Sequence, residues 1–199
     1  MENSLAFVGE ALDATKAAIL GTPRYIWAVP FVLMVLILLV YALPFGWITT
    51  KPIQEIIAPT VIALATAVAT YFYRDNKSTL SLMLTCFAWA LFLRELHLPL
   101  TNNGFYVAIV VLAGWAVKER DALTHWLTET SAGILLPAAF WTYFISKVMD
   151  RHYLGFLPNY YHWNDSVEET LETCGHLMVF ALVIVAMKTL HTVRKNKIT

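Results

Sequence analysis

Charged side chains and a histidine occur inside two segments that are otherwise apolar. Arg94 and Glu95 lie at the end of one segment, and Glu172 and His176 lie within the other, four residues apart. On a helix, this spacing places two side chains on the same face. Ionisable groups inside membrane spans are costly, so they usually face one another or a polar cavity. We therefore expect these four residues to form a functional site.

Two further carboxylates precede Glu172 in its segment. On a helix, Glu168 and Glu169 share a face with Glu172 and His176. The residues from Ser166 to Glu169 also match a capping box, in which Ser166 caps the start of a helix and Glu169 reaches back to the cap residue. Glu168 has a similar alternative, because a carboxylate complements the positive end of the helix dipole. Capping does not account for Glu172 or His176, which lie beyond a first turn.

The end of the first segment is compatible with two roles. Arg94 either neutralises the carboxylates of the second segment, or holds an anionic group. Alternatively, Arg94 and Glu95 extend to the membrane interface. His97 either completes the site or is a solvated residue at the helix end, since Pro99 follows closely. These alternatives cannot be separated by residue spacing.

Carboxylate oxygens and imidazole nitrogens are ligands that suit zinc, manganese or iron. A catalytic zinc ion needs about three protein ligands and an open position, which Glu172 and His176 can supply together with Glu95 or His97. Glu169 is a further candidate ligand. One Glu-x-x-x-His pair does not match the Glu-x-x-His elements of a di-iron bundle. Without a metal, Glu95, Glu172 and His176 remain candidates for acid–base catalysis or proton transfer, and His97 and His176 are an alternative pair of haem ligands.

The composition is that of an integral membrane protein. Of 199 residues, 58% are hydrophobic and 14% are charged, and the mean hydropathy is +0.59. Lys and Arg number 14, as do Asp and Glu, and no basic stripe indicates nucleic acid as a partner. Cys86 and Cys174 lie within apolar runs without metal-ligand spacing, which is typical of small buried residues.

Apolar stretches long enough to cross a bilayer, about 20 residues each, predict an all-helical bundle of six transmembrane helices. The fourth stretch is the shortest. Residues 1–21 have the apolar spacing of an amphipathic helix lying on the membrane interface, and residues 22–199 then form a single transmembrane domain. The six predicted spans are Tyr25–Trp47, Pro52–Tyr73, Thr79–His97, Phe105–Val117, Thr128–Val148 and Glu169–Leu190.

The distribution of basic residues predicts that both termini are cytoplasmic. With this orientation, ten of the 14 Lys and Arg residues lie inside and four outside, as the positive-inside rule requires. The polar cluster then lies near the outer leaflet. The aromatic connection Met149–Ser166 lies on the same side, either as an interfacial belt or as a lid that brings His152, His162 or Asp165 to the cluster.

Two short motifs carry a family resemblance. The segment Arg94-Glu95-Leu96-His97 and the segment Glu168-Glu169-Thr170-Leu171-Glu172 resemble a group of uncharacterised bacterial polytopic inner-membrane proteins. Those proteins have an Arg-Glu helix end and a Glu-Glu-rich helix start. The resemblance implies a bacterial inner-membrane location and a shared site, but it implies no particular activity.

Three classes of function remain open. The first is a metal-binding protein or metal-dependent enzyme acting at the outer leaflet. The second is a non-catalytic subunit of a membrane complex, with another membrane protein or a second copy of the chain as partner within the lipid bilayer. The third is a transporter or proton pathway, which the apolar run from Leu177 to Met187 disfavours because it does not continue the polar residues across the membrane.

The predicted orientation can be tested by cysteine labelling. A cysteine introduced at Asn76 in a cysteine-free background should react with a membrane-impermeant reagent only after the cytoplasmic side is opened. A cysteine at Arg151, assigned to the outer side, should react in intact cells. Labelling of position 76 from outside would contradict both the orientation and the outer location of the cluster.

Overall fold

The computed structural model describes residues 22–98 and 101–196, and every regular element within them is a helix. The amphipathic helix predicted for residues 1–21 lies outside the described residues. In chain order the elements are the 3-10 helix η1 (Arg24–Ala28), α2 (Val29–Ala42), the 3-10 helix η2 (Gly46–Thr49), α3 (Lys51–Asn76), α4 (Thr79–Glu95), α5 (Thr101–Lys118), α6 (Arg120–Glu129), α7 (Ala132–Asp150) and α8 (Tyr160–Asn196).

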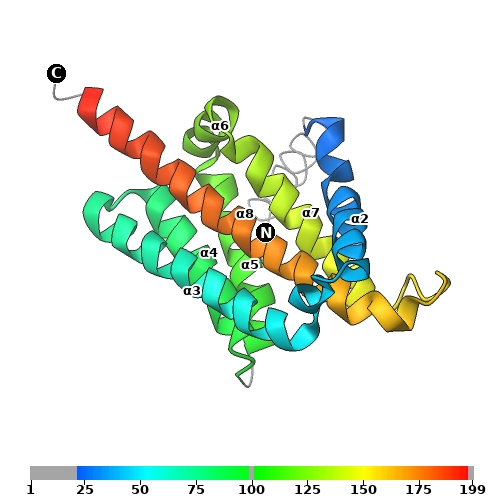
Figure 1. Ribbon diagram of the computed structural model, residues 1–199. Coiled ribbons are helices and arrows are strands. Elements are labelled where there is room, and N and C mark those ends of the chain that lie inside the picture. Colours follow the sequence, from blue (N-terminus) through cyan, green and yellow to red (C-terminus); the bar gives the residue numbers. More distant parts are fainter. Residues whose placement is uncertain (1–21, 99–100, 197–199) are drawn as a thin grey trace, which may run out of the picture.

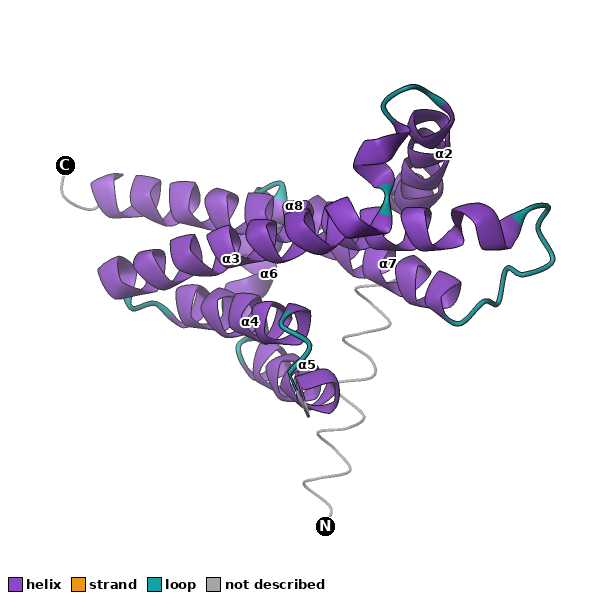
Figure 2. Ribbon diagram, turned by 60° about the horizontal axis from the view of Figure 1, so that its bottom comes forward, coloured by secondary structure: helices purple, strands orange, loops and turns teal. Residues whose placement is uncertain are grey.

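The longest helix, α8, crosses the whole bundle and contacts α2, α3, α4 and α7 (Figure 1). Helix α3 runs beside α8 in the same direction, since Lys51 at its start pairs with Glu169 and Phe72 near its end packs with Ala186. Helices α4 and α7 run in the opposite direction. Figure 2 shows α4 beyond α3 and α5 beyond α4, with α2 at the other side of α8. The fold thus surrounds α8 with partners on several faces.

Four helices are long and apolar enough to cross a membrane: Arg24–Ala42, Lys51–Asn76, Ala132–Asp150 and Tyr160–Thr192. The predicted count of six spans is not confirmed. The third and fourth predicted spans correspond to α4, which has 17 residues, and to α5, whose apolar part is Gly104–Lys118. Both are shorter than the roughly 20 residues that a bilayer requires.

Helix α8 begins nine residues before the span predicted from the sequence, which started at Glu169. Because the helix starts at Tyr160, Ser166 and Glu169 lie inside it. The capping-box interpretation of these two residues is therefore wrong. A capping box forms instead at the start of α4, where the Ser78 hydroxyl accepts a hydrogen bond from the Ser81 amide and the Ser81 hydroxyl accepts one from the Ser78 amide. Cap motifs define a helix start only where the preceding residues cannot extend the helix.

Small residues allow α3 and α4 to pack closely. The Thr66 hydroxyl of α3 lies 3.1 Å from the carbonyl oxygen of Ala88, and the Thr85 hydroxyl of α4 lies 2.9 Å from that of Ala69. Such hydroxyls can donate between helices only when the backbones approach each other, which small side chains permit. This packing fixes the position of α4, whose last turn carries Arg94 and Glu95.

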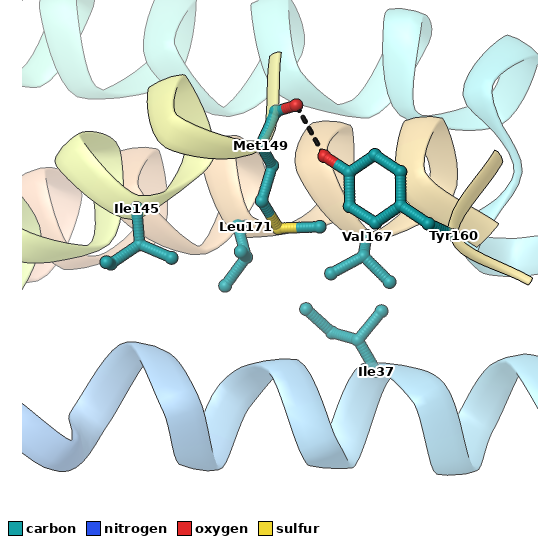
Figure 3. Packing of buried hydrophobic residues seen from close by; sticks show 6 residues of the cluster. All are labelled: Ile37, Ile145, Met149, Tyr160, Val167 and Leu171. Atoms are coloured by element: carbon teal, nitrogen blue, oxygen red, sulfur yellow. Dashed lines mark hydrogen bonds between the residues drawn. The ribbon is translucent and has the colours of Figure 1, made fainter. Parts of the chain in front are cut away.

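A hydrophobic cluster holds the N-terminal half of α8 against α7 and α2. The phenol of Tyr160 donates a hydrogen bond to the carbonyl oxygen of Met149, at 2.7 Å, and so joins the start of α8 to the end of α7. This contact places the carboxylates of α8 at the same level as the last turns of α7. The cluster, shown in Figure 3, consists of Ile37, Ile145, Met149, Tyr160, Val167 and Leu171.

Truncation of a central core residue should destabilise the bundle far more than truncation of a peripheral one. Leu182 of α8 is fully buried against the neighbouring helices, whereas Leu64 of α3 is 53% exposed. Leu182→Ala should cost about 2–5 kcal/mol because it leaves a cavity, and Leu64→Ala less than about 1 kcal/mol. Reversible unfolding in mixed micelles measures both, and equal losses would contradict the packing.

Candidate functional site

The polar cluster lies where the last turn of α4 and the C-terminal half of α7 meet α8. Tyr143 and Lys147 of α7 are four residues apart, as are Glu172 and His176 of α8. Because the two helices are antiparallel, Tyr143 meets His176 and Lys147 meets Glu172. Two matching stripes of polar residues therefore face each other across the helix pair.

His176 connects three helices at the buried end of the cluster. Its side chain is fully buried. Its Nδ1 lies 2.6 Å from the phenolic oxygen of Tyr143, and its Nε2 lies 3.3 Å from Oε1 of Glu95. The Nε2 atom has no hydrogen-bond partner of good geometry among the described residues. A buried nitrogen without a hydrogen-bond partner lowers the stability of the fold, and it indicates a site that can accept another group.

Ion pairs form the outer end of the cluster. Arg94 pairs with Oε1 of Glu172, and Nζ of Lys147 lies 3.8 Å from Oε2 of the same carboxylate. Lys147 Nζ also lies 3.7 Å from Oε1 of Glu168 and 3.4 Å from Oδ2 of Asp150. The Lys147 side chain is 37% exposed, whereas that of Glu172 is 8% exposed. The cluster therefore extends from the molecular surface to the buried histidine.

The structure brings together four of the residues predicted for the site and leaves two apart. Arg94, Glu95, Glu172 and His176 share the cluster. His97 is exposed beyond the end of α4 with a positive φ of 49°, and its Nδ1 lies 2.8 Å from the carbonyl oxygen of Glu95.

Glu169 also lies outside the group, because it points toward the start of α3. Its Oε1 is 3.5 Å from Nζ of Lys51, a side chain that is 49% exposed. The remaining candidates in the aromatic connection are similarly placed. His162 and Asp165 are exposed, and the described contacts of His152 are with Asn164 and with the tyrosines at the start of α8. These contacts do not bring a lid over the cluster.

Glu95, Glu172 and His176 can hold a metal ion. One ligand atom from each lies within 4.8 Å of the other two. A tetrahedral ion with ligands at about 2.1 Å separates adjacent ligand atoms by roughly 3.4 Å, and the Glu95–His176 separation is 3.3 Å. A charge-assisted hydrogen bond would be shorter, at about 2.7–2.9 Å. The carboxylate of Glu172 is also the partner of Arg94 and Lys147, so a metal ion would share it with these two side chains.

Sequence reasoning missed Tyr143 and Lys147 as members of the cluster. Tyr143 is one of several aromatic residues in an apolar span, and Lys147 counted only as one of the four basic residues on the predicted outer side. Their four-residue spacing, which matches that of Glu172 and His176, was the available signal. The signal becomes informative only when α7 and α8 are known to be antiparallel neighbours.

Comparison with known proteins found no matching family model, no matching curated protein and no matching solved structure. Fold and site therefore define the class of this protein. In the part of the chain that the structure describes, it is all-helical with four candidate membrane-spanning helices and has a largely buried group of two glutamates and a histidine that can hold a metal ion.

Removal of Arg94 should destabilise the protein more than removal of Lys51. Arg94 pairs with a buried carboxylate, so Arg94→Met leaves Glu172 with Lys147 alone and should cost about 3 kcal/mol, near the lower end for breaking a buried pair. Lys51→Met breaks a half-exposed pair and should cost less than about 1 kcal/mol. Unfolding midpoints in detergent measure the difference, and equal effects would argue against a buried ionic cluster.

Proposed function

We propose that the chain is an integral membrane protein that binds a divalent transition metal, either zinc, manganese or iron, and acts as a metal-dependent enzyme at one face of the membrane. The ligands are Glu95, Glu172 and His176. The observation that carries this proposal is their convergence from α4 and α8, with ligand atoms within 4.8 Å of one another. Carboxylate oxygen and imidazole nitrogen are appropriate ligands for these metals.

The charge balance of the cluster supports a bound cation. By formal charge, with a neutral imidazole, four carboxylates against two cationic side chains leave two negative charges, and Asp150 among these carboxylates is 44% exposed. A divalent ion neutralises this excess. The carboxylates counted are Glu95, Asp150, Glu168 and Glu172, and the cationic groups are Arg94 and Lys147.

A metal ion held by these three protein ligands would keep one coordination position open. Water bound to the ion at that position would be activated as a nucleophile. Arg94 and Lys147 contact opposite oxygens of Glu172. Released from that carboxylate, they can hold an anionic group of a substrate beside the metal. The partial exposure of Lys147 supports access from the end of the bundle where α7 terminates.

The distribution of basic residues supports an orientation in which that end of the bundle lies near the outer leaflet and both termini lie in the cytoplasm. Together with the resemblance of the two motifs to bacterial inner-membrane proteins, it supports the inner membrane as the location. Lipid is then the surrounding medium for the exposed apolar side chains of the spanning helices, for example those of α2.

One observation favours a second candidate function, that of a non-catalytic subunit of a membrane complex. Arg94 and Lys147 already neutralise Glu172 without a metal, as expected for a cluster that only stabilises the bundle. The exposed apolar surface would then contact another membrane protein or a second copy of the chain. A proton pathway or transporter has less support, because α8 continues from Leu177 to Met187 without a polar residue.

The metal content of the purified protein decides between these candidates. Protein purified in detergent without chelators, then exposed to excess zinc, manganese or iron(II) and desalted, should contain close to one ion per chain by elemental analysis. Glu172→Ala and His176→Ala should lose most of the metal. His97→Ala and Glu169→Ala are matched controls, since both residues lie outside the ligand group, and should retain it.

An absence of metal from folded wild-type protein would overturn the metal-dependent function and favour the structural subunit. Loss of metal from the His97→Ala or Glu169→Ala variant, with retention in the Glu172→Ala variant, would place the ion elsewhere. Circular dichroism of each variant shows that metal loss is not a consequence of unfolding.

A further inference from the structure

We infer that Tyr143 is a positioning residue for His176, and that Gly175 is a glycine because the Tyr143 ring lies against α8 at this point. The inference rests on the proposed function insofar as it assigns Nε2 of His176 to the metal. It adds two residues to the site that the metal-ligand pattern alone does not include.

The contact between Tyr143 and His176 is close and buried. The phenolic oxygen lies 2.6 Å from Nδ1, and the two rings meet edge to face with centroids 5.5 Å apart. His176 is fully buried, so water does not compete for this nitrogen. With Nδ1 held by Tyr143, the ring turns Nε2 toward Glu95. The hydrogen bond therefore determines which nitrogen faces the metal group.

The contact accommodates the tautomer that a metal on Nε2 needs, because a phenolic oxygen can accept a hydrogen bond as well as donate one. A neutral imidazole binds a metal through the nitrogen that carries no proton, so a metal on Nε2 requires the proton on Nδ1. Nδ1 then donates its hydrogen bond to the phenolic oxygen of Tyr143. Partners of this kind fix ring orientation, and their loss typically weakens metal binding by about 10–100-fold.

Gly175 makes room for the Tyr143 ring. A Cβ atom at position 175 would lie 2.8 Å from both Cε1 and Cζ of Tyr143, closer than real contacts allow. A glycine inside a helix costs about 1 kcal/mol relative to alanine, and at position 175 the close Tyr143 ring gives that cost a packing reason. Gly114 of α5 provides the contrast, because a Cβ atom there would meet no atom within 4 Å.

The experiment compares zinc affinity in four variants of the full chain in detergent, measured by competition with a chromophoric chelator. Tyr143→Phe removes only the hydroxyl, and Gly175→Ala displaces the ring. Both should weaken zinc binding by about 10–100-fold. The matched controls are Tyr71→Phe, at a side chain that is 71% exposed, and Gly114→Ala, and both should stay within about twofold of wild type.

The double variant Tyr143→Phe with Gly175→Ala tests whether both changes act through one contact. If they do, the double variant should bind zinc no more weakly than the weaker single variant. If instead the loss of zinc affinity in the double variant equals the product of the two single-variant losses, Gly175 acts independently of Tyr143. That result would overturn this part of the inference.

A second measurement separates positioning from the proposed function. Heteronuclear NMR of isotope-labelled histidine reports the protonated ring nitrogen, with the His176 signal assigned by its loss in His176→Asn. Wild type should show one tautomer, whereas Tyr143→Phe and Gly175→Ala should show a mixture. If wild type binds no zinc but its tautomer is fixed by Tyr143, the metal function fails and the positioning role stands. If zinc binds wild type and both variants equally, with the same tautomer, the inference is overturned and the metal function stands.

Discussion

Two ionisable side chains of α8, Glu172 and His176, are buried inside a bundle whose core is mainly apolar, and this burial governs the structure around them. Neither group is stable there without partners, because a buried charge or polar nitrogen loses its hydration. Their partners come from other helices, Arg94 and Glu95 from α4 and Tyr143 from α7. The three helices are therefore tied together at this level by polar contacts.

These contacts require a precise register between α7 and α8, and the apolar packing supplies it. The hydrogen bond from Tyr160 to Met149 sets the level at which the two helices pair. From that point, residues four apart on one helix meet residues four apart on the other. The absence of a side chain at Gly175 lets the Tyr143 ring lie against α8. A larger residue there would separate the phenol from the histidine.

Within the cluster, Glu172 is the residue for which two kinds of partner compete. Arg94 and Lys147 contact its two oxygens, while Glu95 and His176 lie close enough to share a metal ion with it. The distance between Oε1 of Glu95 and Nε2 of His176 is close to that between adjacent ligand atoms on a tetrahedral ion. A bound cation and the two basic side chains would thus share one carboxylate, which links metal binding to the contacts of Arg94 and Lys147.

The helical character of the chain, four candidate membrane spans among the six predicted, and the common face of Glu172 and His176 could be predicted from the sequence. Hydropathy and the four-residue spacing are local properties, and the cost of burying charge predicts that such residues find each other. The start of α8 at Tyr160, the exposure of His97 and the participation of Tyr143 and Lys147 depended on the tertiary structure. These features follow from the rotation and register of one helix against another, which arise from side-chain packing between segments distant in the sequence.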